Sequence, residues 1–206
     1  MSRKTERILQ ELDRLYPDAS CELHFDNVFQ LLCAVTLSAQ TTDESVNKVT
    51  PALFRDYPDP QTLSAADPKA IEAYIRSIGL YRNKARNLVL MAGKICEDYG
   101  GEVPRSREEL ETLAGVGRKT ANVVLAVGFG EPALAVDTHV ARVSRRLGLA
   151  KEEDDVLEIE KKLMRAFPKE KWAKAHHQLL FFGRYLCRSQ RPLCEECPLR
   201  DLCRYL

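Results

Sequence analysis

The stretch LAGVGRKT, residues 113–120, joins two segments of helical periodicity through a tight turn. Gly115 and Gly117 permit backbone conformations that other residues avoid, and they leave the amide groups of the turn unobstructed. Together with the N-terminus of the following helix, these amides form a cradle for a phosphate. Leu113 and Val116 are expected to anchor the turn between its two helices. Two glycines at this spacing also fit an ordinary helical turn, and the flanking residues favour the phosphate-binding interpretation.

Helical signals continue in both directions from this turn. Apolar residues recur at helical spacing, with capping residues before them and glycines after them. The expected helices are approximately 8–15, 28–37, 43–53, 68–78, 83–99, 107–113, 118–129, 138–147, 156–164 and 172–186. Asp43 is expected to cap the third of these, Asp67 the fourth and Ser106, with Glu109, the sixth. Gly79 is expected to end the fourth. Only Ala133–Val136 suggests a strand, and it is too short to build a sheet, so the sequence predicts an all-α fold.

Composition is that of a globular protein of 206 residues, with 45% hydrophobic and 30% charged residues. No apolar run approaches the ~18–20 residues that a membrane span needs, and the charged start MSRKTERILQEL does not resemble a signal peptide. The net charge is only +1, but its distribution is uneven. Residues 73–96 contain five basic residues and no acidic one, whereas residues 151–160 are strongly acidic. Such a separation favours a partner that carries phosphates, although solvated helix faces would give the same pattern.

Two side chains, one directly after the turn and one 18 residues further along the chain, suggest catalysis. Lys119 falls in the first turn of the second helix, where the helix dipole disfavours a cation and so favours the neutral, nucleophilic amine. Asp137 precedes a further helix, and a carboxylate there could stabilise a developing positive charge or relay protons. Each residue also has a simpler explanation, because Lys119 could contact a phosphate and Asp137 could act only as a helix cap.

Four of the seven cysteines lie within the last 20 residues, with the spacing Cys187-x6-Cys194-x2-Cys197-x5-Cys203. In a chain without a secretion signal, such clustering suggests a metal site more than disulfides. Four thiolates suit either zinc or an iron–sulfur cluster, and the spacing alone leaves the metal open.

Several motifs together resemble a known family. The hairpin resembles the helix-hairpin-helix of non-specific DNA-binding proteins, although Ala114 stands where proline is frequent. The sequence is similar to bacterial endonuclease III, a family of DNA glycosylases, over almost its whole length. The motifs that carry this similarity are LLCAVTLSAQTTD (31–43), IRSIGLYRNKA (75–85), LAGVGRKTANVV (113–124), AVDTHVARVSRRLG (135–148), FFGRYLC (181–187) and the four cysteines.

The resemblance implies a bifunctional base-excision repair enzyme in two helical lobes. One lobe, 21–132, would carry the hairpin, and the other would combine 1–20 with 133–206 and a [4Fe–4S] cluster. Lys119 would displace an oxidised pyrimidine and form a Schiff base that leads to β-elimination, with Asp137 assisting base loss. The implied partner is double-stranded DNA with damaged bases or abasic sites, bound by a monomeric, cytoplasmic protein that associates with the nucleoid.

Further site residues follow from the same resemblance. Gly115, Val116 and Gly117 would hold a phosphate, and Gln40 and Leu80 would fill the gap left in the duplex. Asp43 and His139 match positions that line the lesion pocket of the family. Apart from the resemblance, Arg188 and Arg191 lie on the loop between the first two cysteines, where a bound cluster could fix them against phosphates. The four cysteines would bind the cluster. Two rivals remain at this stage: a monofunctional adenine or mismatch glycosylase, against which Lys119 argues, and a non-catalytic DNA-binding protein.

Overall fold

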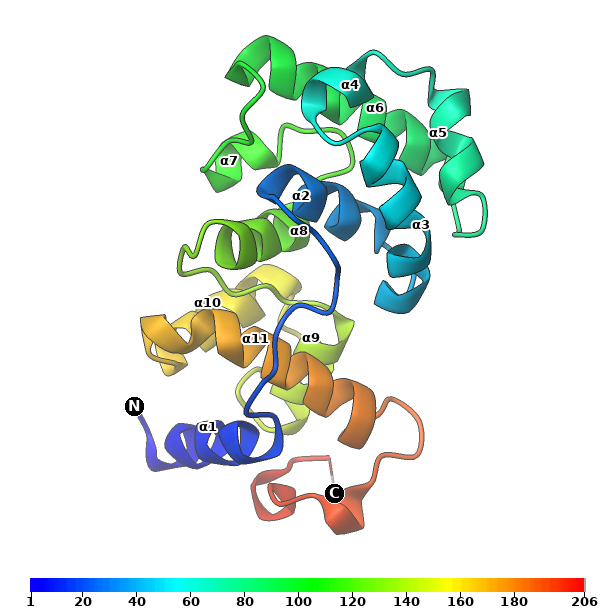
Figure 1. The fold of residues 1–206 in the computed structure, drawn as a ribbon. Helices are drawn as coiled ribbons and strands as arrows, with labels where there is room; N and C mark the ends of the chain where they lie inside the picture. The colour runs from blue at the N-terminus through cyan, green and yellow to red at the C-terminus, as the bar shows by residue number, and fades with distance from the viewer. Residues whose placement is uncertain (206) are drawn as a thin grey trace. The chain divides into compact units, whose positions relative to one another are not determined.

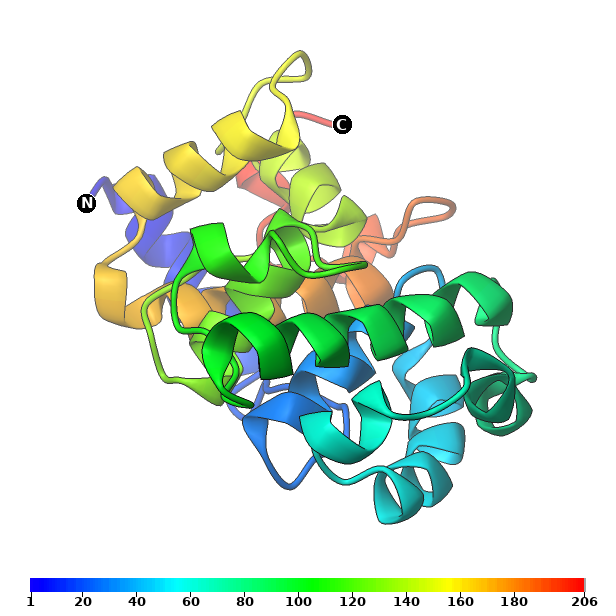
Figure 2. The same cartoon turned by 90° about the horizontal axis from the view of Figure 1, so that it is seen from above.

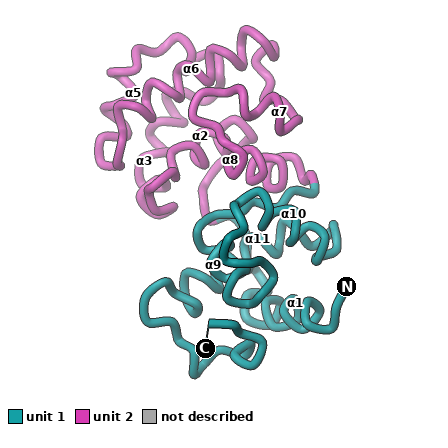
Figure 3. The backbone as a smooth tube through the Cα atoms, turned by 180° about the vertical axis from the view of Figure 1, so that it is seen from behind, with its two compact units in different colours: residues 1–21, 132–206 teal, residues 22–131 magenta. Residues whose placement is uncertain are grey.

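The computed structural model describes residues 1–205, and these residues form helices, turns and loops without a strand (Figure 1). The expected all-α fold is therefore confirmed for this part of the chain, and Ala133–Val136 forms no strand. No helix among the described residues has the length and apolar character that crossing a membrane requires. The chain divides into two compact units, residues 22–131 and residues 1–21 with 132–206 (Figure 3). These boundaries differ by one residue from those expected.

The unit formed by residues 22–131 contains the hairpin. Its helices are α2 (Val28–Leu37), α3 (Asp43–Asp56), α4 (Pro60–Ser64), α5 (Pro68–Ile75), α6 (Tyr81–Tyr99), α7 (Arg107–Leu110) and α8 (Arg118–Val123), which continues as a π-helical turn, Val124–Gly128. Every residue of α2 after Val28 is buried, as its apolar sequence predicts. The long helix α6 packs against α4 and α5, which run beside it in Figure 2. The interior of this unit thus holds the turns between its helices in place.

Three expected helix boundaries in this unit are wrong, and one of them is the end of α7, which lies at Leu110 and not at Leu113. Thr42, not Asp43, is the N-cap of α3, because the Thr42 hydroxyl accepts a hydrogen bond from the Ser45 amide at 3.3 Å. Helix α5 ends at Ile75, four residues before Gly79, and the left-handed residue that follows is Leu80 and not the glycine. The caps expected at Asp67 and Ser106 are confirmed, since both side chains accept from amides of the first turn.

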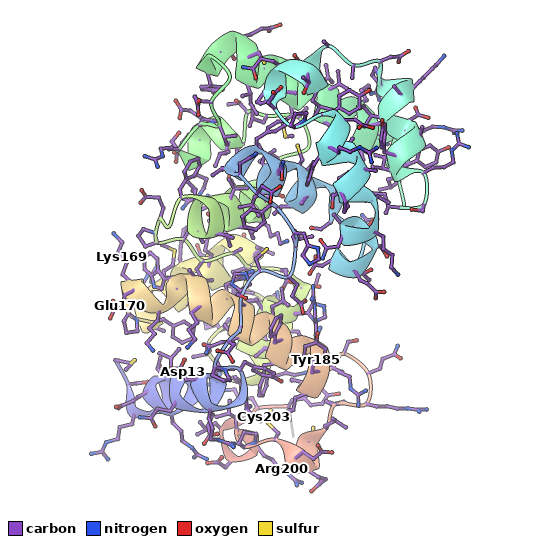
Figure 4. All side chains as sticks on the ribbon, viewed as in Figure 1. Asp13, Lys169, Glu170, Tyr185, Arg200 and Cys203 are labelled. Atoms are coloured by element: carbon purple, nitrogen blue, oxygen red, sulfur yellow. The ribbon has the colours of Figure 1, made fainter. Side chains whose placement is uncertain are left out.

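The second unit is built from both ends of the chain. Its elements are α1 (Arg3–Leu15), α9 (Thr138–Arg146), α10 (Val156–Ala166), the 3-10 turn Lys169–Lys171, α11 (Trp172–Phe181) with a π-helical extension Phe182–Leu186, and two 3-10 turns, Cys194–Glu196 and Arg200–Leu202. Its core gathers apolar residues from α1, α9, α10 and α11, among them Leu12, Val143, Leu163 and Leu179. The C-terminal loop carries Arg200 and Cys203, labelled in Figure 4.

Asp13 ties the first helix to the last one. Its carboxylate accepts hydrogen bonds from Gln178 at 2.8 Å, from Lys174 at 2.9 Å and from Lys171 at 3.1 Å. These partners, Gln178 foremost, lower the pKa of Asp13 to about 2. The N-terminal helix is therefore a packed part of this unit and not a loose extension.

Candidate functional site

The hairpin turn has the geometry that its glycines require. Gly115 adopts a left-handed conformation, with φ +79°, which is unfavourable for other residues. A Cβ at this position would also meet Asn87 Nδ2 at 2.9 Å and Thr36 Cγ2 at 3.2 Å. Val116 and Leu113 are buried, and the Val116 amide donates to the Leu113 carbonyl at 3.1 Å. The turn is therefore held by apolar contacts on one side and left open on the other.

The open side presents unpaired backbone donors. Gly115 and Gly117 are both exposed, and within the described part of the chain neither amide donates to a backbone or side-chain acceptor. Gly117 is the N-cap of α8 and offers no side chain of its own to the first helical turn. Free amides beside a helix N-terminus attract a phosphate, because the donors and the helix dipole act in the same direction. The geometry thus supports the phosphate cradle expected from the sequence.

Lys119 is the second residue of α8, directly after this cradle. Its side chain is half-buried, and no hydrogen bond or ion pair engages it among the described residues of 22–131. An amine without a carboxylate partner stays available for a substrate. A group that approached the cradle through a phosphate would come near this amine, because the two lie within one helical turn of each other.

Asp137 caps helix α9 in the other unit. Its Oδ1 accepts a hydrogen bond from the Val140 amide at 2.8 Å, which fixes the orientation of the carboxylate. The residue is half-buried. His139 lies in the first turn of the same helix, with its Nδ1 3.2 Å from Arg142 Nη2. Gly183 packs against this turn so closely that a Cβ there would meet His139 Cβ at 2.9 Å. The structure therefore places Asp137 and His139 on one rigid helix start.

The left-handed backbone positions coincide with expected DNA contacts. Among the described residues, the non-glycine residues with positive φ are Gln40, Leu80 and Arg191, at 55°, 59° and 49°. All three are exposed, and Leu80 keeps 57% of its surface accessible. Such conformations are unfavourable for side-chain-bearing residues and tend to occur at binding sites. The sequence predicts Gln40 and Leu80 as DNA contacts by resemblance and Arg191 by its place between the first two cysteines, and the backbone conformation is an independent physical signal for all three.

The four C-terminal cysteines surround one cavity. Cys187, Cys194, Cys197 and Cys203 line one common space, together with apolar residues such as Phe182 and Leu186. No three His, Cys, Asp or Glu side chains within residues 1–205 converge on a point where a single metal ion would sit. Four thiols around a shared, largely apolar space are the donor set that a [4Fe–4S] cluster takes from a protein. The residues present therefore fit a cluster.

Two arginines that sequence analysis gave no role hold the cysteine loop. Arg146 Nη1 donates to Cys187 Sγ at 3.4 Å and to the Arg188 carbonyl at 2.8 Å. Arg142 donates to the carbonyls of Gly183 and Cys187, at 2.7 and 3.1 Å. Both project from α9, at positions four residues apart on one helix face. That spacing was visible in the sequence, but only the fold brings the loop to it.

The loop between the first two cysteines is closed by its own backbone. The Leu193 amide donates to the Leu186 carbonyl at 3.0 Å. Arg188 and Arg191 lie on this loop, and both are exposed. No ion pair or hydrogen bond engages either guanidinium among the residues that the structure describes. The loop therefore presents two free positive charges to solvent.

Comparison with known proteins places the hairpin region and the cysteine loop in models of the same kind of DNA repair enzyme. Residues 33–169 match the family model of the HhH-GPD superfamily base excision DNA repair protein, and residues 187–203 match the iron-sulfur binding domain of endonuclease III. Endonuclease III of Bacillus subtilis (strain 168) is 55% identical over 202 residues, which cover 98% of this chain and 92% of that protein. The chain belongs to the endonuclease III family.

Solved structures agree with this assignment. One is described as a trapped endonuclease III–DNA covalent intermediate; it superposes with a TM-score of 0.94 at 54% identity, covering 99% of this chain and 97% of that one. A thermostable thymine-DNA glycosylase superposes with a TM-score of 0.89 at 25% identity, over 98% of this chain and 96% of that one. As a member of the endonuclease III family, the chain is a base-excision repair enzyme, a DNA glycosylase and AP lyase with a [4Fe–4S] cluster.

Proposed function

We propose that Lys119 is the nucleophile of this enzyme. Its Nζ attacks C1′ of the damaged nucleotide, the C1′–N bond breaks, and the base leaves with the electron pair and takes up a proton. The adduct at C1′ is then an aminal: its nitrogen loses a proton, the C1′–O4′ bond breaks and O4′ takes up a proton, which leaves a Schiff base between Lys119 and the opened sugar. Once the Schiff base is protonated, the C2′ proton is acidic. Loss of that proton expels the 3′ phosphate by β-elimination, and hydrolysis then returns the free amine. The observation that carries this proposal is the unpaired Lys119 amine directly after the phosphate cradle.

Asp137 has a different role in the same reaction. A carboxylate fixed by a helix amide keeps one geometry, and it would stabilise the positive charge that develops on the sugar as the base departs. His139, on the same helix, and Asp43, at the start of α3, are proposed to contact the damaged base. A carboxylate and an imidazole offer hydrogen-bonding groups that an oxidised base edge can use.

The enzyme binds DNA mainly through the sugar-phosphate backbone of the DNA. The free amides of Gly115 and Gly117 and the charges of Arg188 and Arg191 contact phosphates, so binding does not depend on sequence. Val116, expected as a third phosphate contact, is buried with its amide bonded to the Leu113 carbonyl, so it holds the turn between the two glycines instead. The exposed side chains of Gln40 and Leu80 enter the duplex where the damaged nucleotide leaves it. The DNA-bound state described for the relative supports this duplex partner.

The proposed substrates are oxidised or ring-saturated pyrimidines in double-stranded DNA, and abasic sites. A damaged base stacks less well than an intact one, so moving it out of the helix costs less free energy. We further propose that the enzyme acts as a monomer in the cytoplasm, on the nucleoid. The four cysteines Cys187, Cys194, Cys197 and Cys203 are proposed as the cluster ligands, and the cluster fastens the loop that carries Arg188 and Arg191.

Borohydride trapping tests the mechanism directly, because reduction of a Schiff base leaves a stable covalent adduct. The enzyme is incubated with a duplex that carries one oxidised pyrimidine, and the adduct is mapped by mass spectrometry. We expect an adduct at Lys119 in the unmodified enzyme and none in K119Q. Lys94, a half-buried lysine whose ammonium pairs with Asp98 at 2.6 Å, gives a control, K94M, that should be trapped normally. An adduct that persists in K119Q, or that maps to another lysine, would disprove the assignment. The same assay separates the enzyme from a non-catalytic DNA-binding protein, which would form no adduct.

A further inference from the structure

Lys84 is the buried member of the basic stretch 73–96. It is 5% exposed, whereas the other four basic residues of the stretch are exposed or half-buried. Its ammonium donates one hydrogen bond, to Thr41 Oγ1 at 2.7 Å, and pairs with no carboxylate among residues 1–205. Burial lowers the pKa of Lys84, and no neighbouring charge offsets this effect. A buried cation without a counter-ion is costly, so packing alone gives no reason for a lysine here.

The single partner of Lys84 belongs to the turn that carries Gln40. The Thr41 amide donates to the Ser38 carbonyl at 3.1 Å, and the Thr41 hydroxyl lies 3.4 Å from the Ala39 carbonyl. An ammonium can only donate, so the hydroxyl accepts from Lys84 and turns its own proton toward Ala39. These contacts enclose Gln40, whose backbone is left-handed. By holding the Thr41 hydroxyl, Lys84 stabilises a turn whose left-handed residue is unfavourable without such a contact.

Lys84 also contacts Leu80, the other non-glycine residue with positive φ among the described residues of 22–131. Its backbone amide donates to the Leu80 carbonyl at 3.0 Å, and Leu80 precedes α6 with φ +59° and without a side-chain cap. One residue therefore bonds to the turn of Gln40 through its ammonium and to Leu80 through its amide. The two exposed side chains, 40 residues apart in sequence, are linked through Lys84.

We propose that Lys84 is a positioning residue that fixes the spacing between the Gln40 turn and Leu80, so that both side chains enter the duplex together. This inference rests on the proposed function, in which Gln40 and Leu80 fill the gap left by the damaged nucleotide. Lys84 itself is buried and acts through Thr41. Its ammonium is therefore required for moving a base out of a duplex, and it is not required for the chemistry on a sugar that is already accessible.

The test compares two substrates that differ in this requirement. One is a duplex with a single oxidised pyrimidine, and the other is a single-stranded oligonucleotide with an abasic site. In K84M, which keeps the length of the side chain and removes its charge, single-turnover base release from the duplex should fall about tenfold, the effect of losing one charge-assisted hydrogen bond. Cleavage of the single strand should stay within about twofold. K94M removes an ammonium of the same helix that pairs with Asp98 and makes no contact with the turn of Gln40, and it should alter neither rate.

Variants of Thr41 show whether the effect passes through this hydrogen bond. T41V removes the acceptor and should reproduce the duplex defect, whereas T41S keeps the hydroxyl and should lose less. The double variant K84M/T41V should be no slower than K84M, because both changes break the same contact. These variants also keep the question open to experiment if K84M does not fold.

Three outcomes would overturn the inference. Equal losses on both substrates would make Lys84 a general structural residue, and additive losses in the double variant would exclude Thr41 as its route of action. An unchanged duplex rate in K84M would remove the positioning role altogether. Failure of the unmodified enzyme to cleave either substrate would instead reject the proposed function, so the two failures are distinguishable.

Discussion

Replacing Gly115 by alanine should destabilise the protein far more than the same change at Gly117. At Gly115 the new side chain must adopt φ +79°, which costs roughly 1–2 kcal/mol for a residue with a Cβ. The Cβ also meets Asn87 Nδ2 at 2.9 Å and Thr36 Cγ2 at 3.2 Å, and displacing these neighbours adds about 1 kcal/mol. The expected loss is therefore about 2–3 kcal/mol.

Gly117 is the matched control, because it belongs to the same turn and has opposite surroundings. Its φ is −105°, and a Cβ there has no neighbour within 4 Å. Alanine is a poorer N-cap than glycine, but it also reduces the entropy of the unfolded chain, and the two effects of about 0.5–1 kcal/mol oppose each other. G117A should therefore change stability by no more than about 0.5 kcal/mol.

Thermal unfolding of the cluster-loaded protein measures the difference. For a chain of this size, 1 kcal/mol corresponds to roughly 2–4 °C, so G115A should melt about 4–12 °C lower and G117A within about 2 °C of the unmodified protein. Iron content measured alongside shows that both variants carry the cluster. Equal melting temperatures for G115A and G117A would refute the reasoning from backbone conformation and close contact.

Three further predictions concern single side chains. D137N keeps a good N-cap and should change the free energy of unfolding by no more than about 0.5 kcal/mol. Because the carboxylate charge is lost, the rate of base release should fall roughly a hundredfold or more, while DNA affinity measured in parallel stays nearly constant. Comparable losses in the rate of base release and in DNA affinity would make Asp137 a structural residue. The pKa of Asp13 is lowered to about 2, so its stabilisation is present above its unfolded pKa of 3.8 and is lost as pH falls through about 2. D13N should accordingly lower the free energy of unfolding by about 1 kcal/mol at neutral pH, after discounting for the partial exposure of the carboxylate. The free energies of unfolding of D13N and the unmodified protein, measured with denaturant, should converge near pH 2. A difference that stayed constant with pH would contradict this origin. C194S should lower iron content and visible absorbance, and retention of a full cluster would exclude Cys194 as a ligand.

Local features of this chain could be recognised without a structure. The glycines of the hairpin, the caps at Asp67 and Ser106, and the buried helix α2 depend on residues within a few positions of one another. At the start of α3 a neighbouring residue decided the outcome. Thr42 outcompeted Asp43 as a cap, since its hydroxyl reaches the Ser45 amide one residue earlier.

The candidate site was recognised in part. Lys119, Asp137 and the four cysteines carried spacing and family similarity, which allowed their roles to be predicted. Arg146 and Lys84 carried no comparable signal. Arg146 reaches Cys187 from 41 residues away in sequence, and Lys84 reaches Thr41 from 43 residues away. Contacts of this kind depend on the path of the chain and leave no short pattern.

The sequence by itself determined the helical fold, the hairpin turn and the cysteine spacing, because periodicity, capping and glycine conformations act over one or two helical turns. Tertiary structure alone decided which basic residue of 73–96 is buried, and which cavity the four thiols share. It also decided that Gln40, Leu80 and Arg191 adopt left-handed backbone conformations. Those conformations are locally unfavourable, so the surrounding structure must hold them, as Lys84 does for the turn of Gln40 through its hydrogen bond to Thr41.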